Sequence, residues 1–263
     1  MLLSQQPRTH FDHPQLREVI CQLRFPAILS IDTQEPAVFQ EAIRREFPRY
    51  TRKQDRIAPK VTLVGGAPQV ANQPPVTNHT FVSQDNRWKL NLTRDFISLS
   101  TLAYNGWEEF GRRLDLPLAQ FIRIYSPSFF HRLGLRYVNI FSRRDLGLED
   151  EPFRELFNDP YLGILSQEDV QETATAKCSV DFDTALDSSC RAKVHAGPGL
   201  VKTNAPNVPQ DTEVKFVLDM DLFMSGELAP AYAAGALETL HAHSTRLFLG
   251  AITDKLYQAL EPR

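Results

Sequence analysis

Apolar side chains alternate with polar ones in several short segments of this chain, a spacing typical of half-buried β-strands. Strands are predicted at residues 18–25, 61–64, 79–83, 88–93, 96–104, 129–141, 172–182, 190–196 and 214–223, of which residues 129–141 are apolar on both faces, as in a central strand. Helical spacing of apolar residues replaces the alternation at residues 35–47, 106–125 and 230–260. Runs of strands interrupted by long helices indicate an α+β fold, mainly antiparallel sheet covered by two or three long helices, with two halves of similar element order.

The charged residues divide the chain near residue 145. Residues 1–145 contain 20 Lys and Arg against 13 Asp and Glu, and residues 146–263 contain 9 against 19. The first part therefore carries a net charge of +7 and the second a net charge of −10. Such asymmetry indicates electrostatic partners, whether another chain, a nucleic acid or a second copy of this protein.

The same division suggests a domain organisation. Residues 1–145 are expected to form a basic α+β half, and residues 169–263 an acidic β-β-β-α half. Glycine and proline punctuate residues 146–168, which are expected to connect the halves. We expect both halves to pack as one compact unit.

Motifs that mark catalysis or cofactor binding are missing from the sequence. Gly65-Gly66 is the one glycine pair, so neither a dinucleotide fingerprint nor a phosphate-binding P-loop is present. His241 and His243 are two apart on an expected helix, whereas chelation from a helix needs a spacing of three or four. No serine lies in a nucleophile elbow. The sequence therefore predicts no catalytic residue, no cofactor and no metal site, and favours a protein that is not an enzyme.

Cysteine usage and hydropathy indicate the cellular location. The three cysteines, Cys21, Cys178 and Cys190, are an odd number at wide spacing and form no Cys-x-x-Cys pair. That usage fits a reducing compartment, where cysteines serve as small buried hydrophobic residues. No stretch approaches the roughly 18 apolar residues that span a bilayer. We therefore expect a cytoplasmic protein that does not contact membranes.

Two arginines and two aspartates lie on strands that are otherwise apolar. The members of each pair are spaced so that both side chains share one face of their strand. A charged group in such a place needs a counter-charge or an opening to water. One interpretation is a structural network of ion pairs, and the other is the lining of a cleft. The candidate residues are Arg132, Arg136, Asn139, Asp219 and Asp221.

The densest positive charge lies in residues 44–60, which are expected to form a loop. Phe47 and Tyr50 add aromatic rings to this segment, a combination that suits nucleic acid. The sequence pI of 6.2 argues against a dedicated nucleic-acid-binding domain, for which a pI above about 9 is typical. Docking to an acidic protein surface, including this protein's own C-terminal half, is the other interpretation. The candidate contact residues are Arg44, Arg45, Arg49, Arg52, Lys53 and Arg56.

Three segments together resemble a known family. They are LREVICQLRF near the start, FFHRLGLRYVNIF in the middle, and VKFVLDMDLF followed by LHAHSTRLFLGAITDKLYQAL at the end. The chain resembles, over nearly its whole length, a sporadically distributed family of prokaryotic proteins of about this length. The resemblance implies no established activity and no catalytic residues. The patchy distribution of the family implies mobile or accessory genes, as in phage defence or toxin–antitoxin neighbourhoods.

These observations favour a non-catalytic cytoplasmic binding protein whose partner is another protein or a second copy of itself. Two alternatives stay open. The first is an α+β ligand binder or enzyme with a pocket lined by Arg132, Arg136, Asp219 and Asp221. The second is nucleic-acid binding through residues 44–60.

Overall fold

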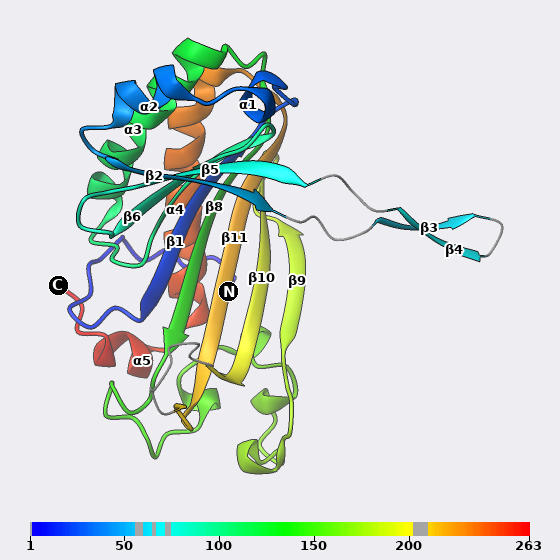
Figure 1. Ribbon diagram of the computed structural model, residues 1–263. Helices are drawn as coiled ribbons and strands as arrows, with labels where there is room; N and C mark the ends of the chain where they lie inside the picture. Colours follow the sequence, from blue (N-terminus) through cyan, green and yellow to red (C-terminus); the bar gives the residue numbers. More distant parts are fainter. Residues whose placement is uncertain (1, 56–59, 65–66, 72–74, 202–209) are drawn as a thin grey trace. The chain divides into compact units, whose positions relative to one another are not determined.

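The computed structural model describes residues 2–55, 60–64, 67–71, 75–201 and 210–263 (Figure 1). The strands in these ranges are β1 (Leu16–Arg24), β2 (Arg49–Asp55), β3 (Lys60–Val64), β4 (Ala67–Ala71), β5 (Val76–Val82), β6 (Trp88–Leu92), β7 (Phe96–Thr101), β8 (Phe130–Phe141), β9 (Val180–Ala185), β10 (Cys190–Leu200) and β11 (Val214–Leu228). The α-helices are α1 (Ser30–Thr33), α2 (Ala37–Ile43), α3 (Trp107–Tyr125), α4 (Ala233–Ala251) and α5 (Asp254–Ala259).

Nine of these strands form one antiparallel sheet in the order β2-β5-β6-β7-β1-β8-β11-β10-β9, and β3 pairs with β4. The prediction of an α+β fold built mainly on antiparallel sheet is therefore confirmed.

The strand β2 lies where the sequence predicted a loop. Its burial pattern shows why, because six of its seven residues are exposed and only Tyr50 is half-buried. A strand exposed on both faces has no alternation of apolar and polar residues, so periodicity cannot detect it. Tyr50 lies opposite Phe81 in the antiparallel register with β5. The structure also forms β4 and the start of β5 between the strands predicted at residues 61–64 and 79–83, while residues 65–66 and 72–74 lie outside the described residues.

The predicted helices at residues 35–47 and 230–260 are shorter or interrupted in the structure. Pro36 lies directly before α2, which ends at Ile43. A break at Thr253 separates α4 from α5, and the Thr253 side chain accepts a hydrogen bond from the backbone N–H of Leu256 at 3.4 Å. Threonine favours this capping position over a helix interior, which explains the interruption.

Contacts divide the chain into two units. The N-terminal unit comprises Ile20–Leu133 and Gly226–Ala233, and the C-terminal unit comprises Met1–Val19, Gly134–Ser225 and Ala234–Arg263. The expected organisation with a connector at residues 146–168 stays a prediction.

Aromatic rings fill the core of the N-terminal unit, where the helix α3 packs against strands. The rings of Trp88 on β6 and Phe110 on α3 have centroids 5.6 Å apart. Phe25 lies 4.7 Å from Phe121 of the same helix. Phe81 of β5 contacts Phe39 of α2 at 5.6 Å. These large buried rings remove much apolar surface from water and account for the stability of this unit.

A second aromatic cluster forms the core of the C-terminal unit. Phe157 stacks on Phe216 of β11 with centroids 3.8 Å apart. Phe141 of β8 contacts Phe157 at 5.0 Å and Phe248 of α4 at 6.2 Å. The cluster therefore joins β8 and β11 to α4 on one face of this part of the sheet.

Within the described residues, no helix combines the length and apolar character needed to cross a membrane.

Candidate binding groove

Polar side chains gather on one face of the strands in the C-terminal unit because successive residues of a strand point to opposite faces. On β10, Ala192 and Val194 are buried, whereas Lys193 and His195 are exposed. On β11, every second residue from Phe216 to Met224 is buried, and Asp219 and Asp221 between them are half-buried. The exposed aspartates of β9 follow the same alternation. The result is a charged face opposite the aromatic cluster.

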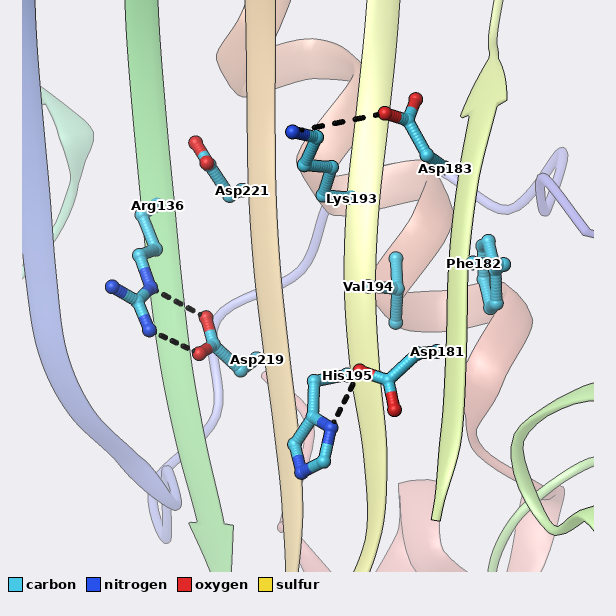
Figure 2. A pocket seen from close by; sticks show the side chains of 9 residues that line it. All are labelled: Arg136, Asp181, Phe182, Asp183, Lys193, Val194, His195, Asp219 and Asp221. Atoms are coloured by element: carbon cyan, nitrogen blue, oxygen red, sulfur yellow. Dashed lines mark hydrogen bonds and ion pairs between the residues drawn. The ribbon is translucent and has the colours of Figure 1, made fainter. Parts of the chain in front are cut away.

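A groove with a volume of about 520 Å³ opens on this charged face (Figure 2). Its volume falls within the range of small-molecule sites, roughly 300–1,000 Å³. The strands β8, β9, β10 and β11 all contribute to it. The lining residues are Arg136, Asp181, Phe182, Asp183, Lys193, Val194, His195, Asp219 and Asp221.

An ion pair joins Arg136 of β8 to Asp219 of β11. The Arg136 Nε donates to Asp219 Oδ1 at 2.7 Å, and Arg136 Nη2 donates to Asp219 Oδ2. This forked geometry is the strong form of the arginine–carboxylate interaction. The hydrogen bond with Asp219 raises the pKa of Arg136 further above its usual range. Arg136 therefore has the carboxylate partner that its position on an apolar strand requires.

The register of the strands places the other charges in two rows. One row contains Asp183, Lys193 and Asp221, because Lys193 lies opposite both aspartates. The other row contains Asp181, His195 and Asp219, with His195 in the middle. Each basic side chain thus lies between two carboxylates from neighbouring strands.

Short contacts hold these rows in place, as Figure 2 shows. The His195 Nδ1 lies 2.8 Å from Asp181 Oδ1, and the Lys193 Nζ lies 3.8 Å from Asp183 Oδ2. The Lys193 ammonium also lies 5.7 Å from the centre of the Phe223 ring. All these side chains keep contact with solvent, so each pair contributes little stability on its own, about 0–1 kcal/mol.

The charges of the groove do not cancel. Four carboxylates face two permanent cations, Arg136 and Lys193, so the formal charge is −2 when His195 is neutral. A protonated His195 would reduce this to −1. The groove therefore attracts cationic groups and repels anionic ones. Among the described residues, no group of three or more His, Cys, Asp or Glu side chains is arranged to hold a metal ion.

Three of the five candidate residues from the sequence meet in the groove: Arg136, Asp219 and Asp221. Asn139 is buried and donates a hydrogen bond from Nδ2 to the backbone oxygen of Leu218 at 3.2 Å, so it belongs to a structural network. Arg132 is half-buried on β8 within the N-terminal unit and does not line the groove.

Sequence reasoning missed four of the charged residues that line the groove. The sequence could have revealed these residues, because two residues that are two apart on a strand share one face. This spacing holds for Asp181 and Asp183 on one strand and for Lys193 and His195 on the next. That signal was hidden by the predicted strand boundary, which ended at residue 182 in the middle of β9. Which charges stand opposite each other depends on register, which periodicity does not determine.

Of the candidate contact residues, Arg44 and Arg45 directly follow α2, and Arg49, Arg52 and Lys53 lie on β2. Arg44, Arg45 and Lys53 are exposed, and among the described residues no acidic partner contacts them. Arg49 donates a hydrogen bond to the Asn86 side chain, and Arg52 pairs with Glu35 at 3.1 Å. Arg56 lies outside the described residues.

Neither aromatic ring of this segment is exposed. Phe47 is fully buried, and Tyr50 is half-buried. The Tyr50 hydroxyl donates to Glu35 Oε2 and lies 2.9 Å from His79 Nδ1, while His79 Nε2 lies 2.8 Å from the backbone oxygen of Ile31. Burial raises the pKa of Tyr50, and the hydrogen bond with Tyr50 lowers that of Glu35. This network anchors β2 to the segment before α2.

A second polar cluster in the C-terminal unit joins the turn between β9 and β10 to α4. Asp187 accepts hydrogen bonds from the backbone N–H groups of Ser189 and Cys190, both at 2.7 Å. His243 Nε2 lies 2.7 Å from the other carboxylate oxygen. These contacts, led by the Ser189 backbone, lower the pKa of Asp187 to about 2. His243 is thus a partner of Asp187 rather than of His241, which lies 2.7 Å from the Tyr137 hydroxyl.

The cysteines do not line the groove. Cys21 and Cys190 are buried, and burial raises the pKa of each thiol to about 12. Thiols with such pKa values are almost entirely protonated at neutral pH, which makes them poor nucleophiles.

No protein-family model matches the chain, and no curated protein matches its sequence.

Proposed function

We propose that this chain is a non-catalytic cytoplasmic binding protein that recognises a cationic segment of a protein partner in the groove. The observation that carries the proposal is the excess of carboxylates over cations among the lining residues. Lysine and arginine side chains of a partner would complete the two rows of charges. Electrostatic complementarity of this kind selects partners and orients them during encounter.

The arrangement of the charged pairs supports binding rather than chemistry. Arg136, Lys193 and His195 each contact a carboxylate on a neighbouring strand, so their positions are set before a ligand arrives. A surface with such preorganised charges loses less side-chain entropy when a partner binds.

We also propose that two or three long helices cover one face of the sheet, and that the chain consists of two halves of similar element order. A helix-covered face would leave the charged face open to a partner.

A peptide assay tests this proposal. A fluorescein-labelled peptide of alternating lysine and threonine should bind the protein at low salt, measured by fluorescence anisotropy. Asp183→Asn/Asp221→Asn should weaken binding about fivefold or more, because each substitution removes one negative charge that attracts the lysines of the peptide. Binding should also weaken at about 1 M salt, where charges are screened within about 3 Å.

The matched control is Glu168→Gln/Glu227→Gln, which removes two exposed charges outside the groove. This variant should bind the peptide nearly as well as the original protein. Equal losses in both variants, or equal binding of a glutamate–threonine peptide, would show that the groove is not the site. A small cationic ligand that competes with the peptide would favour the alternative of a ligand-binding pocket.

Nucleic-acid binding through residues 44–60 is the second candidate function. The exposure of Arg44, Arg45 and Lys53 without an acidic partner among the described residues favours it. The burial of Phe47 and the bonding of Tyr50 oppose it, because neither ring is available to stack on a base. Filter binding of labelled RNA and DNA, repeated after replacing Arg44, Arg45 and Lys53 with glutamine, distinguishes this function. If the filter retains as much labelled nucleic acid with the variant as with the original protein, nucleic-acid binding through this segment is excluded.

A further inference from the structure

Two strands of the nine-stranded sheet have a hydrogen-bonded neighbour on one side only. In the N-terminal unit β2 pairs with β5 alone, and in the C-terminal unit β9 pairs with β10 alone, within the described part of the chain. Figure 1 shows the open side of β9. Such edge strands present unpaired backbone N–H and C=O groups, which are a template for another strand.

The two edge strands carry opposite charges on corresponding faces. Tyr50 of β2 points toward Phe81 and His79 in the core of its unit, so Arg49, Thr51, Lys53 and Asp55 point to the other face, which has a net charge of +1. On β9, Phe182 contacts Tyr161 in the core of its unit. Its neighbours Asp181 and Asp183 are exposed on the opposite face. The apolar side of β9 therefore faces its core and its aspartates face solvent, whereas β2 is exposed on both faces and carries Arg52 and Gln54 on the same side as Tyr50.

We propose that β2 of one copy of this protein adds to β9 of a second copy, so that the partner recognised by the groove is the protein itself. This inference rests on the proposed function, because Asp181 and Asp183 line both the groove and the edge. Main-chain hydrogen bonds would supply affinity, as in other cases of strand addition, and the charges would select the partner.

The charge pattern selects one antiparallel register. Placing Lys53 opposite Asp181 also places Thr51 opposite Asp183. Arg49 then lies diagonal to Asp183, within reach of its long side chain. In this register Lys53, Thr51, Asp181 and Asp183 share one face, and Arg52 lies opposite Phe182 on the other face.

Pairing β9 with β9 would bring aspartates together. Pairing β2 with β2 has a register that places Arg49 opposite Asp55, but it would leave the aspartates of β9 without a role, and the Asp181→Lys/Asp183→Lys variant would then associate as the original protein does. The proposed contact is between two different edges, a heterologous interface that produces rings or open chains. The present partners of the aspartates do not prevent the contact, because His195 and Lys193 form exposed pairs that contribute little.

Sedimentation velocity of the full chain tests the inference. The average mass should rise with protein concentration at low salt and fall at about 1 M salt. Arg49→Glu/Lys53→Glu should weaken self-association about tenfold or more, and so should Asp181→Lys/Asp183→Lys. An equimolar mixture of these two variants should associate again, because each supplies the charge that the other needs. Restored association also shows that both variants are folded.

Arg44→Glu/Arg45→Glu is the matched control, since it makes the same change in charge outside the strand. If it weakens association as much as the β2 variant does, general attraction rather than strand pairing is responsible and the inference is wrong. A monomer at all concentrations, or a mixture that fails to associate, would also overturn it. The lysine–threonine peptide separates the two proposals. If it binds the groove of a monomeric protein, the proposed function stands and this inference fails, whereas absent peptide binding contradicts the proposed function itself.

Discussion

Phe157→Ala is expected to lower the free energy of unfolding by about 3–5 kcal/mol, the usual cost of deleting a buried aromatic ring. Phe157 is 1% exposed, and its ring stacks on Phe216 at 3.8 Å and contacts Phe141 at 5.0 Å. Its removal would leave a cavity beneath β8 and β11, the strands that carry Arg136 and Asp219. Urea unfolding followed by circular dichroism measures the effect.

Phe157→Leu is the control for this substitution. Leucine fills most of the space of the ring, so the loss should be about 1–2 kcal/mol. Under conditions where Phe157→Ala remains folded, we expect it to bind the lysine–threonine peptide with nearly the original affinity, because no atom of Phe157 lines the groove. Equal stability of the alanine variant and the original protein would show that the aromatic cluster is not the core of this unit.

Asp187→Ala is expected to destabilise the protein by about 2 kcal/mol. The substitution leaves the backbone N–H groups of Ser189 and Cys190 and the His243 ring without their acceptor. Cys190 is buried, and a buried donor that loses its partner costs more than a hydrogen bond contributes on average. Asp187→Asn retains one acceptor oxygen and should cost less. Thermal unfolding of both variants at neutral pH measures the difference.

The same residue predicts a pH dependence of stability. The pKa of Asp187 falls from 3.8 to about 2 in the folded protein, so the folded state favours the ionised carboxylate. A lowered pKa gives stability that is fully present above about pH 4 and is lost as the pH falls toward 2. The slope of stability against pH in this window should be smaller for Asp187→Asn. An identical slope in both proteins would contradict the role of Asp187.

Strands with one buried face were predictable because their pattern is local. The sequence predicted β6, β8 and the first part of β11 close to their observed positions. It failed at β2, which is exposed on both faces and has no pattern to detect. It also failed at β9, where the predicted strand at residues 172–182 begins in what the structure forms as turns and ends before Asp183. Edge strands are thus the elements that periodicity describes worst, and in this protein they carry the proposed contact.

The candidate site was predictable in part for the same reason. That Arg136 requires a carboxylate follows from the cost of placing a charge on an apolar strand. That Asp219 supplies it, while Asn139 bonds to a backbone oxygen instead, follows only from the packed structure. The aromatic residues of the basic segment are a case in which the sequence pattern suggested a role that burial excludes. Phe47 and Tyr50 suggested stacking on bases, but Phe47 is buried and Tyr50 is held by Glu35 and His79.

The amino-acid sequence by itself determined the α+β class, the alternation of buried and exposed faces and the opposite charges of the two parts of the chain. These properties depend on residue type and on spacing within a single element. The tertiary structure alone decided which charges meet, because strand register brings together residues as distant as Arg136 and Asp219. It also decided that a basic strand and an acidic strand lie at edges, since an edge is defined by the absence of a neighbour among the described strands. Pairing between strands is a property of the whole sheet, and no local pattern encodes it.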